Sequence, residues 1–316
     1  MKQAIVTGAT GFIGSAFVEL LINKNIQVLS LGRKPFDKIP KDKKKKLSGS
    51  LYLNLDMKNI SNLRNEINKL DWIIGNDCVF FNLAWGGKER LSDLDVEAQI
   101  ANIGWCVNAI KVAKEICCKR FIQVGTMEEL FTHKYLGLNH HTNDEYNRHV
   151  IYSVAKISAK FALELYSSLL EMELIYVINS HVIGPNDDKD SFLQVTLEKM
   201  VKNEDLVFSS GEQYFDTVSL DDCVFGYYLI CKKGRSGSNY WVGSGEPCRI
   251  KDYVKRMSKL FSPNKNLQFG KLPYNDIMLN PEDFSVDLLT EHTGYKPKLS
   301  FEQTIIKLYE SMFDKK

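Results

Sequence analysis

The sequence predicts an α/β protein with a doubly wound parallel sheet, followed by a smaller α/β unit. Three observations predict this class. Short, continuous apolar runs alternate with helical segments, as expected for parallel strands that helices cover on both faces. A glycine-rich loop joins the first apolar run to the first helix. The chain has 316 residues, which is enough for two domains of about 150 residues each.

Strand and helix alternate up to about residue 180. The predicted strands of the large sheet are Gln3–Val6, Ile26–Leu31, Leu51–Leu55, Cys78–Ala84, Arg120–Val124 and Leu174–Ile178. The predicted helices run from Phe12 to Asn25, over about 94–117 and over about 152–170. Beyond residue 180, prolines interrupt the pattern, and strand-like pieces such as Tyr240–Val242 are short.

This change of pattern predicts two domains. We expect a cofactor-binding domain over 1–178 and about 212–243. We expect a substrate-binding domain over about 179–211 and 244–316.

Composition excludes several classes of function. The 41 basic and 39 acidic residues leave a formal charge of +2, which is not the electrostatic footprint of a nucleic-acid-binding protein. No apolar run reaches the roughly 18 residues of a membrane span, and the N-terminus has no secretory signal pattern. The seven cysteines lack metal-ligand spacing. We therefore expect no metal site, reduced thiols and a cytoplasmic location.

The loop from Thr7 to Gly14 has the spacing G-x-x-G-x-x-G between a strand and a helix. Glycines there let the strand turn, let a pyrophosphate approach the backbone and let the helix pack on the strand, while the helix N-terminus offers N–H groups to phosphates. A tight turn also needs glycine, but this context favours dinucleotide binding. The predicted contacts are Gly8, Thr10, Gly11, Phe12, Ile13 and Gly14.

The end of the second strand indicates which dinucleotide binds. An acidic residue there would bind the ribose hydroxyls of NAD, whereas this chain has Arg33 and Lys34. Two cations suit the additional phosphate of NADP, and the alternative is an ordinary solvated loop. We therefore expect NADP(H) as the cofactor.

Tyr152 and Lys156 have the spacing i and i+4, so they share one face of a predicted helix. Tyrosine, with a pKa of about 10, is a weak acid–base group at neutral pH, but a neighbouring lysine cation lowers that pKa. Thr126 follows a predicted strand, at the sheet edge where doubly wound sheets bind ligands. Tyr228 and Lys232 have the same spacing, but they lie in an apolar stretch, and we interpret them as packing residues.

The glycine loop, Asn82-Leu83-Ala84, Thr126 and the Tyr152–Lys156 pair together resemble the extended short-chain dehydrogenase/reductase superfamily. The resemblance is strongest to its nucleotide-sugar epimerases, dehydratases and 4-ketoreductases, spans nearly the whole chain and implies a Rossmann-type fold. The cofactor contacts that it implies are Asp56, Leu83, Ala84, Tyr152 and Lys156. The catalytic residues that it implies are Thr126, Tyr152, Lys156 and Asn102, which places a water. The substrate contacts that it implies are Trp85, Met127, Glu128, His181 and Gln213.

Departures from the family pattern narrow the chemistry. The 4,6-dehydratases carry Thr-Asp-Glu where this chain has Thr126-Met127-Glu128. Methionine cannot donate the proton that helps to eliminate water, so we expect no dehydratase activity. Glu128 contacts sugar hydroxyls or makes a structural hydrogen bond, and Trp85 flanks the sugar or belongs to the core. Phe215 stands where many relatives have a nucleotide-binding arginine, which argues against a diphosphate clamp there.

The resemblance implies NADPH-dependent reduction of a 4-keto sugar, commonly 6-deoxy, on a nucleoside diphosphate, in the biosynthesis of an unusual sugar for a surface polysaccharide. One alternative is a nucleotide-sugar epimerase with tightly bound NAD. An alternative of another class is a non-catalytic NADP-sensing regulator. Relatives often dimerise through two helices per subunit, here about 94–117 and 152–170, so we expect a homodimer. A loop over about 131–150, with three histidines that bind no metal, is expected to cover the cleft.

Overall fold

The large sheet has seven strands, in the order β11-β6-β5-β4-β1-β2-β3. The computed structural model describes residues 1–87, 95–136, 150–187, 191–274 and 277–313. The strands of this sheet are β1 (Gln3–Thr7), β2 (Gln27–Gly32), β3 (Leu51–Asn54), β4 (Val79–Asn82), β5 (Arg120–Val124), β6 (Glu173–Asn179) and β11 (Asn239–Val242). All their pairings are parallel. The strand order reverses between β1 and β4, which places a crevice for ligands at their carboxyl ends. The predicted doubly wound fold class is confirmed.

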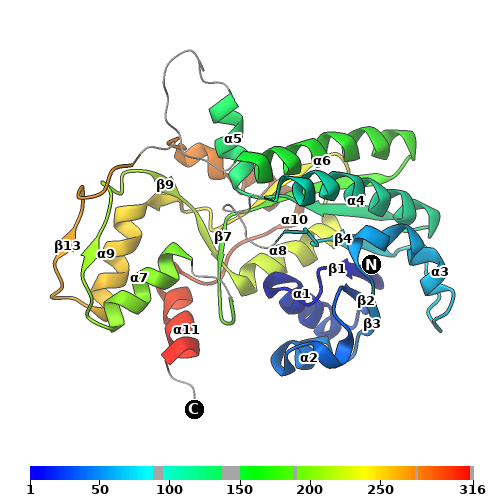
Figure 1. The fold of residues 1–316 in the computed structure, drawn as a ribbon, viewed down its shortest axis with the longest axis horizontal. Helices are drawn as coiled ribbons and strands as arrows, with labels where there is room; N and C mark the ends of the chain where they lie inside the picture. Colours follow the sequence, from blue (N-terminus) through cyan, green and yellow to red (C-terminus); the bar gives the residue numbers. More distant parts are fainter. Residues whose placement is uncertain (88–94, 137–149, 188–190, 275–276, 314–316) are drawn as a thin grey trace.

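Helices cover both faces of this sheet (Figure 1). The helices on one face are α1 (Phe12–Asn23), α8 (Leu220–Lys233) and α10 (Asp287–Thr293). The helices on the other face are α3 (Leu63–Ile67), α4 (Val96–Glu115) and α6 (Val150–Leu169). The shorter connecting helices are η1 (Phe36–Lys38), α2 (Lys41–Leu47) and η2 (Met57–Asn62).

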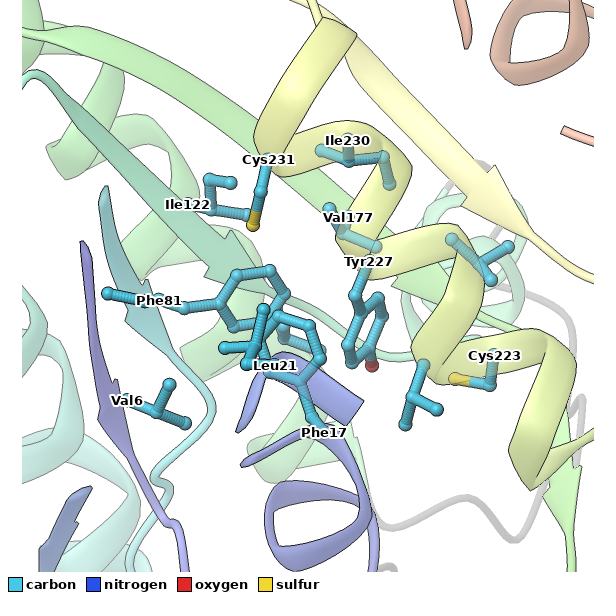
Figure 2. Close-up of a cluster of buried hydrophobic side chains, with 14 of the residues drawn as sticks. Val6, Phe17, Leu21, Phe81, Ile122, Val177, Cys223, Tyr227, Ile230 and Cys231 are labelled. Carbon is cyan, nitrogen blue, oxygen red and sulfur yellow. The ribbon is translucent and has the colours of Figure 1, made fainter. Parts of the chain in front are cut away.

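The two-sided burial explains why the strands are apolar without alternation. Phe81 points to the α1–α8 face, where its ring centroid lies 4.6 Å from that of Phe17 and 4.8 Å from that of Tyr227. Figure 2 shows these rings packed between the sheet and the two helices. The neighbouring Phe80 points to the opposite face and stacks on Phe121 at 5.2 Å. Successive strand residues therefore enter two separate cores.

A second lobe lies beside the sheet (Figure 1) and has its own apolar core. Its helices are α7 (Phe192–Val201), α9 (Ile250–Phe261) and α11 (Phe301–Phe313), with the short helix η3 (Pro281–Phe284) nearby. Its strands pair in twos, namely β7 (His181–Ile183) with β10 (Thr217–Ser219), β8 (Leu206–Val207) with β13 (Leu267–Gln268), and β9 (Tyr214–Phe215) with β12 (Cys248–Arg249). The predicted division of the chain into two domains stays a prediction, and α10 packs against α8 and β11 of the large sheet.

The predicted loop over 131–150 is wrong in its first part, because α5 (Glu128–Leu136) continues to residue 136. Glu128 and Glu129 in the first turn favour a helix start through the helix dipole, a signal that the loop prediction overlooked. Residues 137–149, with His140 and His141, lie outside the described residues. In the described ranges, every helix is too short or too polar to cross a membrane.

Candidate active site

The carboxyl ends of β1, β4 and β5 lie side by side, and a row of buried polar side chains crosses them. Thr7 Oγ1 donates to Asn82 Oδ1 at 2.6 Å, and Asn82 Nδ2 donates to Gln123 Oε1 at 2.7 Å. Thr7 Oγ1 also accepts the backbone N–H groups of Leu83 and Ala84. The loop after β4 is thereby held against the glycine loop after β1.

The loop between β1 and α1 requires glycine at two positions. Gly8 has a φ of +66°, in the left-handed region that favours glycine. Gly14 packs so closely that a Cβ there would lie 2.1 Å from Gly8 O. Gly11 is the N-cap of α1, and no side chain caps this helix, so its first turn presents N–H groups and a positive dipole to an anion. The other predicted contacts of this loop are Thr10 before the helix, and Phe12 and Ile13 in its first turn.

The predicted NADP-selecting cations lie at the end of β2, next to β1. Arg33 and Lys34 are both exposed. The Tyr52 hydroxyl donates to Lys34 O at 2.6 Å, so the turn is anchored from β3 while both cationic side chains face water. Asp56, after β3, is half-buried and accepts Lys58 N at 3.1 Å. These residues therefore border the same sheet edge as the glycine loop.

The loop after β4 is fixed by α4. Asn102 Oδ1 accepts Gly86 N at 2.6 Å, and Asn102 Nδ2 donates to Gly86 O and Ala98 O at 3.0 and 2.8 Å. Trp85 Nε1 donates to Gln99 Oε1 at 2.8 Å. The Asn102 amide therefore holds the backbone beside Trp85, and its expected role in placing a water stays a prediction.

Tyr152 and Lys156 lie in the first two turns of α6 and face the Trp85 ring. Lys156 Nζ lies 4.0 Å from the Trp85 ring centroid and 5.9 Å from that of Tyr152. The Trp85 and Tyr152 rings meet edge to face at 6.2 Å. Lys156 is buried and donates to Val124 O at 3.0 Å. Burial lowers the pKa of Lys156 from 10.5 to about 8, so its proton is labile much closer to neutral pH than that of an exposed lysine.

Thr126, after β5, is tied to a residue that the sequence interpretation missed, Glu129. Glu129 Oε1 accepts Thr126 N at 2.8 Å and the Tyr176 hydroxyl at 2.9 Å. Burial raises the pKa of the Glu129 carboxyl, although the Thr126 N–H, Lys156 and Tyr176 act in the opposite direction. The sequence signal for this carboxyl is the glycine at position 125, directly after β5. A Cβ there would lie 2.3 Å from Glu129 Oε1, so only glycine leaves room for the carboxyl.

The predicted substrate contacts lie in both lobes. Met127 is buried in an apolar cluster with Trp241, and its role as a substrate contact stays a prediction. Glu128 is half-buried at the start of α5, beside Thr126. His181 lies on β7. Gln213 precedes β9, and within the described residues its Oε1 is buried without a hydrogen-bond partner.

The second Tyr–Lys pair lies on the other side of the sheet, on α8. Lys232 Nζ lies 5.4 Å from the Tyr228 ring centroid, Lys24 Nζ lies 5.9 Å from it, and Phe225 stacks on that ring. These contacts agree with a packing role for the pair.

Known proteins of similar sequence and structure have this architecture. Residues 4–243 match the model of the NAD dependent epimerase/dehydratase family. The chain is 23% identical over 319 residues to CDP-abequose synthase from Salmonella typhimurium, covering 98% of each chain. It is 22% identical over 329 residues to dTDP-glucose 4,6-dehydratase from Haemophilus influenzae, covering 96% of this chain and 95% of the relative.

The solved structures include UDP-glucose 4-epimerase from Thermotoga maritima, with UDP-glucose. It is 18% identical, has a TM-score of 0.76 and is matched over 99% of both chains. At this identity the likeness shows a shared fold. The family match, in contrast, spans both the glycine loop and the Tyr152–Lys156 helix, and the chain therefore belongs to the NAD dependent epimerase/dehydratase family.

Proposed function

We propose that this protein uses NADPH to reduce a 4-keto sugar carried on a nucleoside diphosphate. The observation that carries the proposal is the Tyr152–Lys156 pair on α6, joined through Val124 O to the end of β5, two residues before Thr126. The names of the relatives, which refer to CDP-, dTDP- and UDP-linked sugars, support the substrate class. Methionine at position 127, which has no proton to donate, supports a reaction without the acid that a dehydratase needs.

The first half of the sheet fits a dinucleotide with an additional phosphate. Gly11 lets a pyrophosphate approach the uncapped start of α1, while Gly8 provides the turn and Gly14 the close packing of α1 on the loop. Arg33 and Lys34, exposed at the end of β2, offer the charge that a 2′-phosphate requires. The nicotinamide supplies the hydride when the cofactor is bound.

The residues of the chain then handle the proton. The Tyr152 hydroxyl donates its proton to the ketone oxygen as that oxygen becomes an alkoxide. The Lys156 cation stabilises the phenolate that remains, and the Thr126 hydroxyl orients the carbonyl. In the alternative, an epimerase with bound NAD, the same residues would move the proton in both directions.

The test supplies a 4-keto-6-deoxy nucleotide sugar in limiting amount, with a panel of CDP, dTDP, GDP and UDP carriers. We expect one NADPH to be oxidised per sugar, measured by absorbance, and a product heavier by two hydrogens, measured by mass spectrometry. If the protein instead retains NAD through purification and interconverts two sugars of equal mass, it is an epimerase and the proposal fails. Tight NADPH binding without turnover on any carrier would favour the regulator.

A homodimer is part of the proposal. Phe161, Leu165 and Leu169 form a stripe along α6, each at least 60% exposed, and Ile100 on α4 is 56% exposed. Contiguous apolar surface of this kind marks an interaction site, and these two helices pack side by side (Figure 1). We expect light scattering to give a dimer for the wild type and a monomer for Leu165→Glu. A monomeric wild type at micromolar concentration would overturn this part.

A further inference from the structure

The buried carboxyl group of Glu129 lies behind the residues that we assign to proton transfer. Glu129 is 1% exposed, and its Oε1 holds both the backbone N–H of Thr126 and the hydroxyl of Tyr176. A carboxylate this deeply buried is costly unless donors and an opposite charge satisfy it. The sequence must therefore provide both space and charge for it.

Gly125 provides the space. A Cβ at this position would lie 2.3 Å from Glu129 Oε1 and 2.6–2.7 Å from the ring and hydroxyl of Tyr176. The carboxyl reaches the end of β5 only because residue 125 has no side chain.

Two lysines of α6 provide the charge. Lys156 and Lys160 both act on the Glu129 carboxyl, and Lys160 Nζ lies 5.2 Å from the Tyr176 ring centroid. The other titratable groups facing this network are Tyr176 on β6, Tyr152 on α6 and Cys106 on α4. Burial raises the pKa of Cys106 to about 11, so its thiol is neutral at pH 7 and Glu129 remains the acidic partner of Lys156.

We propose that Glu129 is a positioning residue of this site: its carboxyl holds the backbone of Thr126, next to the Val124 carbonyl that Lys156 Nζ holds, and it acts on the charge of Lys156. The proposal rests on the proposed function in one respect, namely that the Lys156 charge is used in proton transfer. Its electrostatic part holds for the free protein, whatever the substrate is.

Burial moves the pKa of Lys156 down to about 8, and negative charge on Cys106 or Glu129 moves it up. Because the pKa of the Cys106 thiol is about 11, Glu129 is the group that supplies this charge near pH 8. Without that carboxylate, Lys156 would lose its proton closer to neutral pH, and the stabilisation of the Tyr152 phenolate would go with it.

The experiment follows the Lys156 side chain by NMR in protein with isotope-labelled lysines, assigned with Lys156→Met. In Glu129→Gln, the amide oxygen can still accept the Thr126 N–H, but the charge is gone. We expect the pKa of Lys156 to fall by about one unit, and the alkaline limb of the kcat/KM profile to move by the same amount. Glu164→Gln, an exposed acid two turns along α6, is the matched control and should leave the pKa of Lys156 unchanged.

Circular dichroism first establishes that Glu129→Gln is folded. If it is not, Glu129→Asp keeps the charge, withdraws it by one methylene and should lower the same pKa by a smaller amount. An unchanged pKa of Lys156 in the folded variant would overturn the proposal, and lost turnover with that pKa unmoved would make Glu129 merely structural. Because the NMR titration needs no substrate, failure of the reductase assay leaves it intact.

Discussion

Glu129 and Asp216 are both buried carboxyl groups, and each lies against a glycine that leaves room for it. A Cβ at Gly125 would lie 2.3 Å from Glu129 Oε1, and one at Gly243 would lie 1.9 Å from Asp216 Oδ2. Their partners differ. Glu129 lies within the electrostatic influence of the buried cation of Lys156, whereas Asp216 is held by neutral donors.

The donors to Asp216 are Trp241 Nε1 at 2.9 Å, the N–H and hydroxyl of Ser244, and the backbone N–H of Thr217. Burial raises the pKa of Asp216 to about 6 despite these hydrogen bonds. A carboxyl that is satisfied by neutral dipoles ties segments of chain together, here the link between β9 and β10 to β11 and the turn after it. A carboxyl that shares its site with a buried cation instead controls a proton. Four substitutions test whether this distinction between the two sites holds.

The largest effect is expected on turnover, from a substitution at Tyr152, the tyrosine next to Lys156. Tyr152→Phe removes the proposed proton donor and keeps the ring, so turnover should fall about 10²–10⁴-fold while NADPH still binds. Steady-state rates and a cofactor titration measure both quantities. Tyr228→Phe is the matched control on α8 and should leave turnover unchanged. Near-normal turnover of Tyr152→Phe would remove this residue from the mechanism.

Lys156→Met tests the cost of the buried cation. Because the folded pKa of about 8 lies below the ordinary 10.5, the unfolded chain binds more protons between these values, and wild-type stability gains as pH rises through this window. Relative to Lys156→Met, the free energy of unfolding of the wild type should increase by about 2–3 kcal/mol from pH 7 to pH 10. Urea unfolding of both chains at the two pH values measures the difference. A constant difference would mean that Lys156 titrates normally.

Asp216→Asn tests the carboxyl that is held by neutral donors. Its contribution to stability changes with pH in the opposite direction to that of Lys156. The folded pKa of about 6 lies above the ordinary 3.8, so the wild type gains stability from this group as pH falls from 7 toward 4. Relative to Asp216→Asn, the free energy of unfolding of the wild type should rise by about 2 kcal/mol from pH 7 to pH 4.5. Urea unfolding of both chains at the two pH values measures the change. The pH profile of turnover should not move, and a shifted profile would blur the distinction between the two sites.

Arg33→Ala tests a third kind of charged group, one whose side chain is exposed to water. Loss of a charge-assisted contact to a 2′-phosphate should weaken NADPH binding about tenfold and leave NADH binding nearly unchanged. Fluorescence titration with both cofactors measures the ratio. Lys38→Ala, an exposed cation on η1, should have little effect. Equal losses for NADPH and NADH would mean that Arg33 does not select the phosphate.

The large sheet was predictable because each buried parallel strand is an apolar run, and β5 has the predicted bounds, Arg120–Val124. The paired strands of the second lobe were not, because two or three residues such as Tyr214–Phe215 show no periodicity. Glu128 and Glu129 illustrate the same limit at the site. Adjacent acids point in different directions, and which one turns inward depends on where α5 begins.

The buried row of Thr7, Asn82 and Gln123 has a consequence for how the chain folds. Strands that are apolar on both faces can slip by two residues and still bury apolar side chains, so apolar patterning specifies their alignment weakly. The hydroxyl and the two amides pair only where Thr7 faces Asn82 and Asn82 faces Gln123. Any slip leaves buried polar groups unpaired, at about 1–3 kcal/mol each. The row therefore disfavours sheets with a shifted register. It also aligns the ends of β1, β4 and β5, so that the loops that follow them lie side by side.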